Sequence, residues 1–230
     1  MGLDLIPVHL RERYRFAERE HACSILAKDF PKQFKDILDC LTAFTLKKSY
    51  ITAAGQNRSP VPEAIDGFFQ GAAPVLAKKS GRTKPKNREP IPLIGDPVGR
   101  GWKEKKFDIT IEVDGRSVPI PTHKIDNFLQ IQGDARGVGI EVEWNNKTEF
   151  YDRDLNNFRL LRQLGVLSVG VIITRDTELQ KIFNGLGKGN SYGTSTTHWD
   201  KLIPKVDGGG AGGCPLLLVG MGTKCYDPNS

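Results

Sequence analysis

The first third of the chain shows hydrophobic positions at helical spacing. Over residues 9–50 this spacing predicts helices, and a second helix is expected over 59–70, where Ser, Pro and Glu stand at the start. The stripe expected to face the core consists of Phe34, Ile37, Leu38, Leu41 and Phe44. Residues 71–100 break the pattern with Pro, Gly and basic residues, which predicts a long loop or an insertion.

From Phe107 onward the hydrophobic period changes to two. Alternation predicts a strand over 107–113, and Asp114 with Gly115 predicts a hairpin turn into a second strand. The later elements are expected to be strands at 139–144, 166–174 and 215–219, and helices at 152–164 and 176–186. The strand, helix and apolar strand within 139–174 predict a βαβ unit with a parallel pair, and therefore an α/β fold.

Composition indicates one globular domain over residues 1–230. Hydrophobic residues make up 38% of the 230, which is enough for a sizeable core. We find no apolar run that approaches the roughly 20 residues of a membrane helix, so no membrane partner is expected. Four widely spaced cysteines predict reduced thiols, and hence a cytoplasmic protein.

The net charge of +6 is concentrated in one stretch. Residues 78–106 contain ten Lys and Arg against three Asp and Glu, a local balance of +7. Such a stretch indicates contact with a polyanion, for which nucleic acid is the first candidate, or else a solvated loop.

The strand predicted at 139–144 contains two carboxylates. Glu141 and Glu143 are two positions apart, so both side chains leave the same face. Between apolar neighbours they would be costly unless a cation neutralised them or the strand lay at a solvent-facing edge. A third carboxylate, Asp126, lies just upstream. Three such oxygen-bearing groups suit Mg²⁺.

Several motifs together resemble a known family. From about Phe34 to Gly220 the chain contains, in the family's order, THKID, IEVEWNNK, DRDLNNFRLL and GTSTTHWDKL. These resemble the type II restriction endonucleases of the BglII-like group (BglII/BamHI-like), within the PD-(D/E)xK nuclease class. The resemblance implies a restriction-endonuclease-like core, with a central mixed β-sheet flanked by helices.

The resemblance also implies an activity and its partners. The expected reaction is Mg²⁺-dependent hydrolysis of phosphodiester bonds in double-stranded DNA at a short palindromic site, with Mn²⁺ as a substitute metal. The expected assembly is a homodimer, and a companion DNA methyltransferase would act on the same site. The rival hypotheses are a DNA-binding protein with an inactive nuclease fold and a structure-specific repair nuclease.

Site residues follow from the same resemblance. Asp126 and Glu141 correspond to the family's metal ligands, and Glu143 occupies the third catalytic position, where it could accept a proton from the attacking water. The gap between Asp126 and Glu141 is longer than in the group, so Asp134 stands as an alternative metal ligand. Glu104, in GWKEKKF, is a further candidate acid near the metal.

The expected DNA contacts lie in three segments. Ser195 to His198 could read base edges or simply cap the following helix. The full set of expected DNA-contacting residues is Asn57, Arg58, Asn145, Asn146, Lys147, Ser195, Thr196, Thr197 and His198.

Overall fold

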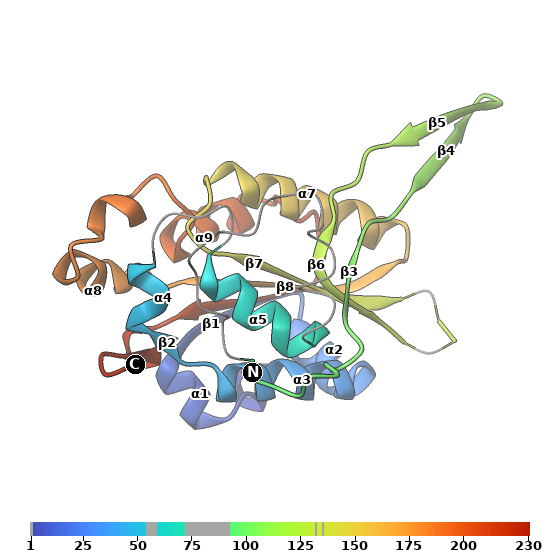
Figure 1. Ribbon diagram of the computed structural model, residues 1–230. Helices are drawn as coiled ribbons and strands as arrows, with labels where there is room; N and C mark the ends of the chain where they lie inside the picture. The colour runs from blue at the N-terminus through green and yellow to red at the C-terminus, as the bar shows by residue number, and fades with distance from the viewer. Residues whose placement is uncertain (1, 54–58, 72–92, 132, 135) are drawn as a thin grey trace.

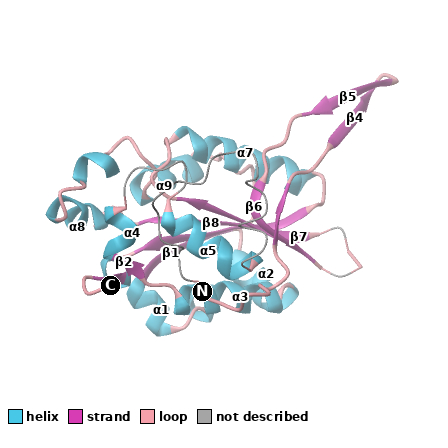
Figure 2. Cartoon of the chain, viewed as in Figure 1, coloured by secondary structure: helices cyan, strands magenta, loops and turns pink. Residues whose placement is uncertain are grey.

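The computed structural model describes residues 2–53, 59–71, 93–131, 133, 134 and 136–230. A six-stranded mixed sheet of order β1-β9-β8-β7-β6-β3 runs through its centre, with helices on both faces (Figures 1 and 2). The strands of this sheet are β1 (Tyr14–Arg19), β3 (Lys103–Lys105), β6 (Ile125–Gln130), β7 (Gly137–Glu143), β8 (Leu167–Arg175) and β9 (Leu216–Met221). The expected α/β architecture is confirmed.

The βαβ unit is also present. Strands β7 and β8 pair in parallel, and helix α7 (Glu149–Gln163) connects them. Every residue of β8 is buried, because β7 and β9 flank this strand and helices cover both of its faces. Helix α7 begins three residues earlier than the pattern predicts, and the added first turn includes Tyr151, which is buried with Leu155 and Phe158.

The two faces of the sheet have separate cores. On one face, Val138, Ile140 and Val142 pack against the helices that precede the hairpin and against α8. The helices of this side are α1 (Val8–Arg13), α2 (Ala22–Asp29), α3 (Pro31–Ala43), α4 (Lys48–Thr52), α5 (Pro60–Gln70) and α8 (Leu179–Gly185). On the other face lie α7 and α9 (Trp199–Asp207). Among the described residues, we find no helix that combines the length and the hydrophobicity of a membrane span.

The expectation of helices throughout 9–50 is wrong at two places. Residues Tyr14–Arg19 form edge strand β1, which pairs antiparallel with β9. Leu46–Lys47 form β2, which pairs with β10 (Tyr226–Asp227). Both partners lie near the C-terminus, so the pairing is a long-range contact that local periodicity cannot show. Three short 3₁₀ helices complete the described elements: η1 (Gly2–Leu5), η2 (Gly189–Tyr192) and η3 (Thr223–Cys225).

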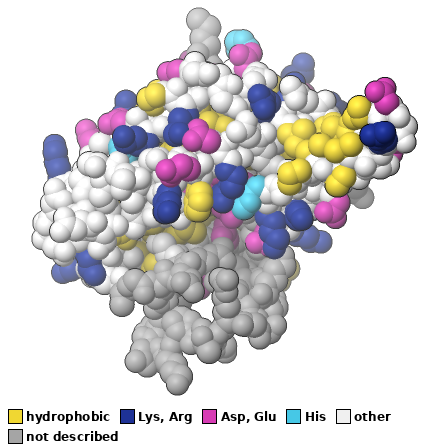
Figure 3. Space-filling model, turned by 90° about the horizontal axis from the view of Figure 1, so that it is seen from above, with side chains coloured by type: hydrophobic (Ala, Val, Ile, Leu, Met, Phe, Trp, Pro, Cys, Tyr) yellow, Lys and Arg dark blue, Asp and Glu magenta, His cyan; other side chains and the backbone are white. Residues whose placement is uncertain are grey.

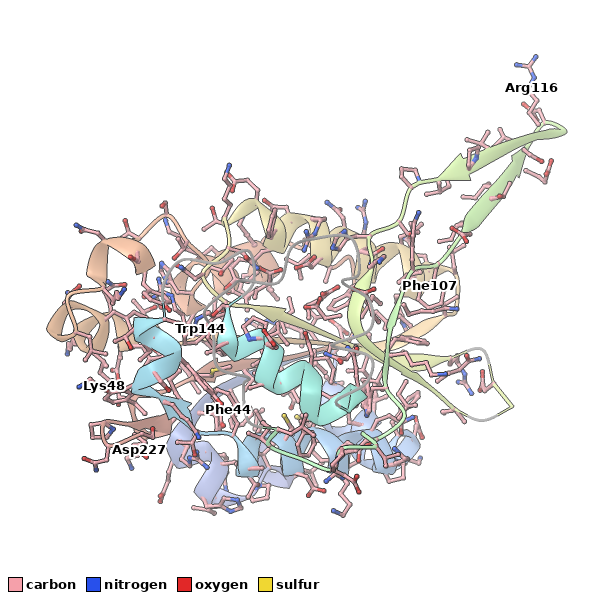
Figure 4. The ribbon with its side chains drawn as sticks, in the orientation of Figure 1. Phe44, Lys48, Phe107, Arg116, Trp144 and Asp227 are labelled. Carbon is pink, nitrogen blue, oxygen red and sulfur yellow. The ribbon has the colours of Figure 1, made fainter. Side chains whose placement is uncertain are left out.

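The predicted hairpin is present but stands apart from the sheet. Within the described part of the chain, strands β4 (Ile109–Val113) and β5 (Arg116–Ile120) pair only with each other, and the turn residues Asp114 and Gly115 both have positive φ. The ribbon projects from the body with Arg116 at its tip (Figures 1 and 4). Its apolar side chains are exposed, as the hydrophobic patch along the arm in Figure 3 shows. The period-two pattern therefore marks a hairpin outside the core. Most of the expected insertion at 71–100 lies outside the described residues.

Candidate active site

Asp126 and Glu141 meet where strands β6 and β7 stop pairing. The regular ladder runs from Gln130 opposite Gly137 to Asn127 opposite Ile140. One residue further along each strand, hydrogen bonds to side chains take the place of the backbone–backbone hydrogen bonds. The backbone N–H of Asp126 donates to Glu141 Oε2 at 3.3 Å, and the N–H of Val142 donates to Asp126 Oδ2 at 3.0 Å. The two carboxylates are thereby held side by side at the splayed strand ends.

Glu141 and Glu143 both project toward α7 and are almost fully buried, at 1% and 2% exposure. Strand β7 lies inside the sheet, so the alternative of a solvent-facing edge strand is wrong. Glu141 Oε1 has no hydrogen-bond partner among the described residues. Burial, followed by the charge of Asp126, raises the pKa of Glu141 well above its usual value. A buried carboxylate oxygen of this kind requires a proton or a cation.

Glu143 lies in a polar pocket between β7 and α7. Its Oε2 accepts a hydrogen bond from Asn146 Nδ2 at 2.7 Å, and its Oε1 lies 3.3 Å from Arg153 Nη2. Burial and then the neighbouring Asp154 raise the pKa of Glu143 to about 9. Burial raises the pKa of Asp154 to about 6, while Arg153, 2.8 Å away, opposes that rise. Burial and mutual repulsion therefore disfavour a negative charge on both carboxyl groups at once.

Sequence reasoning missed Arg153 and Asp154. They lie in the motif DRDLNNFRLL, which supports the family resemblance but contains none of the predicted site residues. Asp154 has a signal in the sequence: it stands three residues after Tyr151 and four before Phe158, on the buried face of α7. An acid at an inward-facing helical position needs a partner or a function. Asp154 is completely buried, and its Oδ2 accepts no hydrogen bond from the described residues.

The carboxylates lie as two pairs, Asp126 with Glu141 and Glu143 with Asp154. Among the described residues there is no group of three or more His, Cys, Asp or Glu that could hold a metal ion. Mg²⁺ does not require such a group, because it is usually held by one or two carboxylates and keeps waters and phosphate oxygens as its other ligands. The unpartnered Glu141 Oε1 beside Asp126 fits this mode of binding.

Of the other two candidate acids, only Asp134 lies away from this junction. Asp134 lies in the turn between β6 and β7, at the opposite end of this strand pair from Asp126, and forms an ion pair with Arg136 at 2.6 Å. Glu104 lies on β3 between the residues that pair with Ile125 and Phe128, and therefore next to the stretch of β6 that contains Asp126. It forms an ion pair with Lys124 at 2.9 Å and is one-third exposed.

The expected DNA-contacting segments on either side of α7 lie together. Asn146 and Thr197 are joined by two hydrogen bonds, from the Thr197 N–H to the Asn146 carbonyl and from the Asn146 N–H to Thr197 Oγ1. Lys147 and Thr196 form a β-bridge. This junction follows directly after Trp144, whose buried ring Figure 4 marks.

Individual residues of these segments differ in their accessibility. Lys147 and Ser195 are exposed, and Thr196 is half-buried. Thr197 and His198 are buried, and His198 is the N-cap residue of α9 with its ring nitrogen 3.1 Å from Thr177 Oγ1. Asn145 adopts positive φ, and its side-chain oxygen is buried without a partner in the described part of the chain. Asn57 and Arg58 lie outside the described residues.

Comparison with known proteins adds the family. The family model for "Restriction endonuclease BglII/BglIII" matches residues 14–221, from the first residue of β1 to the last of β9. No curated protein matches the chain. The match spans the whole six-stranded sheet and both carboxylate pairs. The chain therefore belongs to the BglII/BglIII restriction endonuclease family, and is a site-specific deoxyribonuclease that hydrolyses phosphodiester bonds in double-stranded DNA.

Proposed function

We propose that this nuclease is Mg²⁺-dependent and cleaves a short palindromic sequence as a homodimer. In this proposal Asp126 and Glu141 hold the metal, and Glu143 accepts a proton from the attacking water. The observation that carries the proposal is the junction of β6 and β7, where two carboxylates meet and Glu141 Oε1 is buried without a partner.

Asp126 is the better candidate than Asp134 for the first acid. Asp126 lies against the β7 backbone beside Glu141, whereas Asp134 is engaged by Arg136 at the other end of the strand pair. When bound, Mg²⁺ supplies positive charge that stabilises the reacting phosphate and acidifies a bound water. Mn²⁺ prefers the same oxygen ligands and is expected to substitute.

Glu143 can act as a base only after it loses its proton. Its pKa of about 9 describes the site without a cation, where burial and Asp154 both disfavour a second negative charge. Positive charge near Glu141 would lower this pKa, which would leave Glu143 ionised and oriented by Asn146. Arg153 remains between Glu143 and Asp154 to balance their charge.

The DNA contacts are proposed for the accessible side chains next to this pocket. Asn146 and Lys147 follow the catalytic strand, and Ser195 and Thr196 lie beside them. Thr197 and His198 would act as supports for these contacts, since both are buried. A twofold homodimer would place two such sites on the two strands of a palindrome. A companion methyltransferase in the same cytoplasm would protect that sequence.

The test is incubation of the purified protein with a plasmid of known sequence, with Mg²⁺ or with EDTA. Discrete fragments that appear only with Mg²⁺ are expected, and sequencing their ends gives the site. A smear would instead indicate a structure-specific or non-specific nuclease. A salt-sensitive gel shift without cleavage would indicate binding alone. Sedimentation of the free protein tests the homodimer separately.

A further inference from the structure

We propose that Arg175 is a positioning residue that couples the segment 192–198 to the catalytic carboxylate of Glu143, so that cleavage depends on the sequence being read. The inference rests on the proposed DNA contacts of Ser195 and Thr196. It concerns how those contacts are transmitted to the site.

Arg175 is the last residue of β8 and is 1% exposed. Its guanidinium group faces the segment 192–198. Nε donates to the Thr197 carbonyl at 3.1 Å, while Nη2 lies 3.1 Å from the Tyr192 carbonyl and 3.1 Å from Thr196 Oγ1. Nη2 is also 3.3 Å from the Gly193 carbonyl. One side chain therefore holds three backbone carbonyls of a segment that has no regular ladder of its own.

Among the residues that the structure describes, the hydrogen-bond acceptors of Arg175 are all uncharged. Besides the loop, the described contacts are Gln180 Oε1 at 3.3 Å from Nη1 and the ring of Phe183, 5.4 Å from the guanidinium carbon. Burial of a guanidinium group away from carboxylates is costly, which lowers its pKa to about 10. If this position only had to fill space in the core, an aliphatic side chain would be buried at a lower free-energy cost than Arg. The planar guanidinium group of Arg can donate to several of the loop carbonyls at once, which a side chain with a single donor could not do.

The loop is connected to Glu143 on one side through Asn146. Thr197 and Asn146 exchange two hydrogen bonds, at 2.9 Å and 3.1 Å, and the Asn146 side chain donates to Glu143 Oε2 at 2.7 Å. A displacement of Thr197 would therefore move the amide that orients the catalytic carboxylate.

A second connection runs through the sheet. Thr174 precedes Arg175, lies opposite Glu143 in the β7–β8 register, and donates from Oγ1 to the Glu143 carbonyl at 2.9 Å. Arg175 is thus fixed to the same pair of strands that fixes the backbone of Glu143. The guanidinium group and Thr174 together hold the loop and the carboxylate in one rigid unit. Loss of the guanidinium group would release the segment 192–198. The position of Glu143 would then no longer depend on whether this segment contacts a correct or an incorrect base, so the difference in cleavage rate between the two sites would become smaller.

The test uses two variants at this link and one control. Arg175→Lys keeps the charge but loses the fork, and Thr197→Val removes the hydroxyl that accepts the Asn146 N–H. The control is Arg13→Gln, because Arg13 also holds backbone carbonyls, but those of Thr42 and Phe44, which are not part of the segment 192–198. Single-turnover cleavage is measured at the recognised site and at a site with one base changed. Amide hydrogen exchange is measured without DNA.

For both link variants we expect slower cleavage at the recognised site, by about tenfold, and a ratio of recognised to altered site that falls by about tenfold. The amides of Asn146 and Thr197 should exchange faster, while the amides of β8 and β9 stay protected. Arg13→Gln should lower overall stability and leave the ratio unchanged.

The proposal is overturned if Thr197→Val, correctly folded, retains the parent's ratio and exchange rates. The proposal is likewise overturned if Arg175→Lys is folded and retains the parent's cleavage ratio and exchange rates. Should Arg175→Lys fail to fold, Thr197→Val decides alone. If the parent itself produces no discrete fragments, the proposed function fails, whereas the exchange measurement still tests the link.

Discussion

The backbone amide of Val142 donates a 3.0 Å hydrogen bond to the side chain of Asp126, where a paired strand would offer a carbonyl oxygen. This contact fixes Asp126 to the strand that contains the two glutamates. It also explains why the β6–β7 ladder ends at Asn127: the acceptor for β7 at that point is a carboxylate. The same hydrogen bond therefore positions Asp126 beside Glu141 and ends the pairing of β6 with β7.

Asp126→Asn is expected to reduce cleavage by about a thousandfold or more, because it removes a negative charge from the proposed metal site. Asp134→Asn is the matched variant, since it weakens an exposed ion pair in the turn at the other end of the strand pair. We expect Asp134→Asn to cleave within about twofold of the parent, since exposed ion pairs contribute little. Cleavage rates at saturating Mg²⁺ distinguish the two, and the reverse result would identify Asp134 as the first acid.

Glu141→Gln should abolish cleavage and stabilise the protein in EDTA. The amide has no charge to bury, so the cost of the unpartnered Oε1 is reduced. Thermal unfolding with EDTA and with Mg²⁺ measures this effect. Mg²⁺ should raise the melting temperature of the parent but not that of the variant. Glu12→Gln, at an exposed position of α1, serves as the control and should behave like the parent. Equal Mg²⁺ stabilisation of Glu141→Gln would contradict the assignment of Glu141 as a ligand.

Stability without metal should fall as the pH rises. In the folded protein the pKa of Glu143 is about 9, against an ordinary value of 4.5 in the unfolded chain. Between these values the folded state retains a proton that the unfolded state has released, so the free energy of unfolding decreases with increasing pH. Urea unfolding in EDTA at about pH 6 and about pH 8.5 measures the slope. Glu143→Gln should make this slope shallower, while the raised pKa of Glu141 still contributes to it. An unchanged slope would show that Glu143 is ionised throughout.

Gly170→Ala should destabilise the fold by about 1–3 kcal/mol, as overpacking of a core does. A Cβ at this position of β8 would overlap the Phe158 ring on the buried face of α7. Because α7 also contains Asp154, we expect slower cleavage as well. Gly185→Ala is the control, since a Cβ there meets nothing within 4 Å. Chemical denaturation of both variants checks the difference, and equal stability would show that α7 can shift at little cost.

The hydrophobic pattern was sufficient wherever burial follows a local period. The stripe of Leu155, Phe158 and Leu161 predicted α7, and the apolar run over 166–174 predicted β8. It failed where a contact is long-range. Strand β1 looks helical in isolation, and only its pairing with β9 makes it extended. The hairpin alternates as a core strand does, yet its two strands pair with no other strand in the portion of the chain that the structure describes.

For the site, strand alternation is enough to place Glu141 and Glu143 on one face. The family resemblance, which is also read from the sequence, names Asp126. That β7 is an interior strand, and that its two carboxylates are therefore buried, follows only from the folded arrangement of the sheet. Only the structure brought in Asp154 from α7 and tied Thr197 to Asn146. The physical reason is that a local pattern specifies the direction of a side chain, whereas its dielectric surroundings and partners depend on which distant elements pack against it.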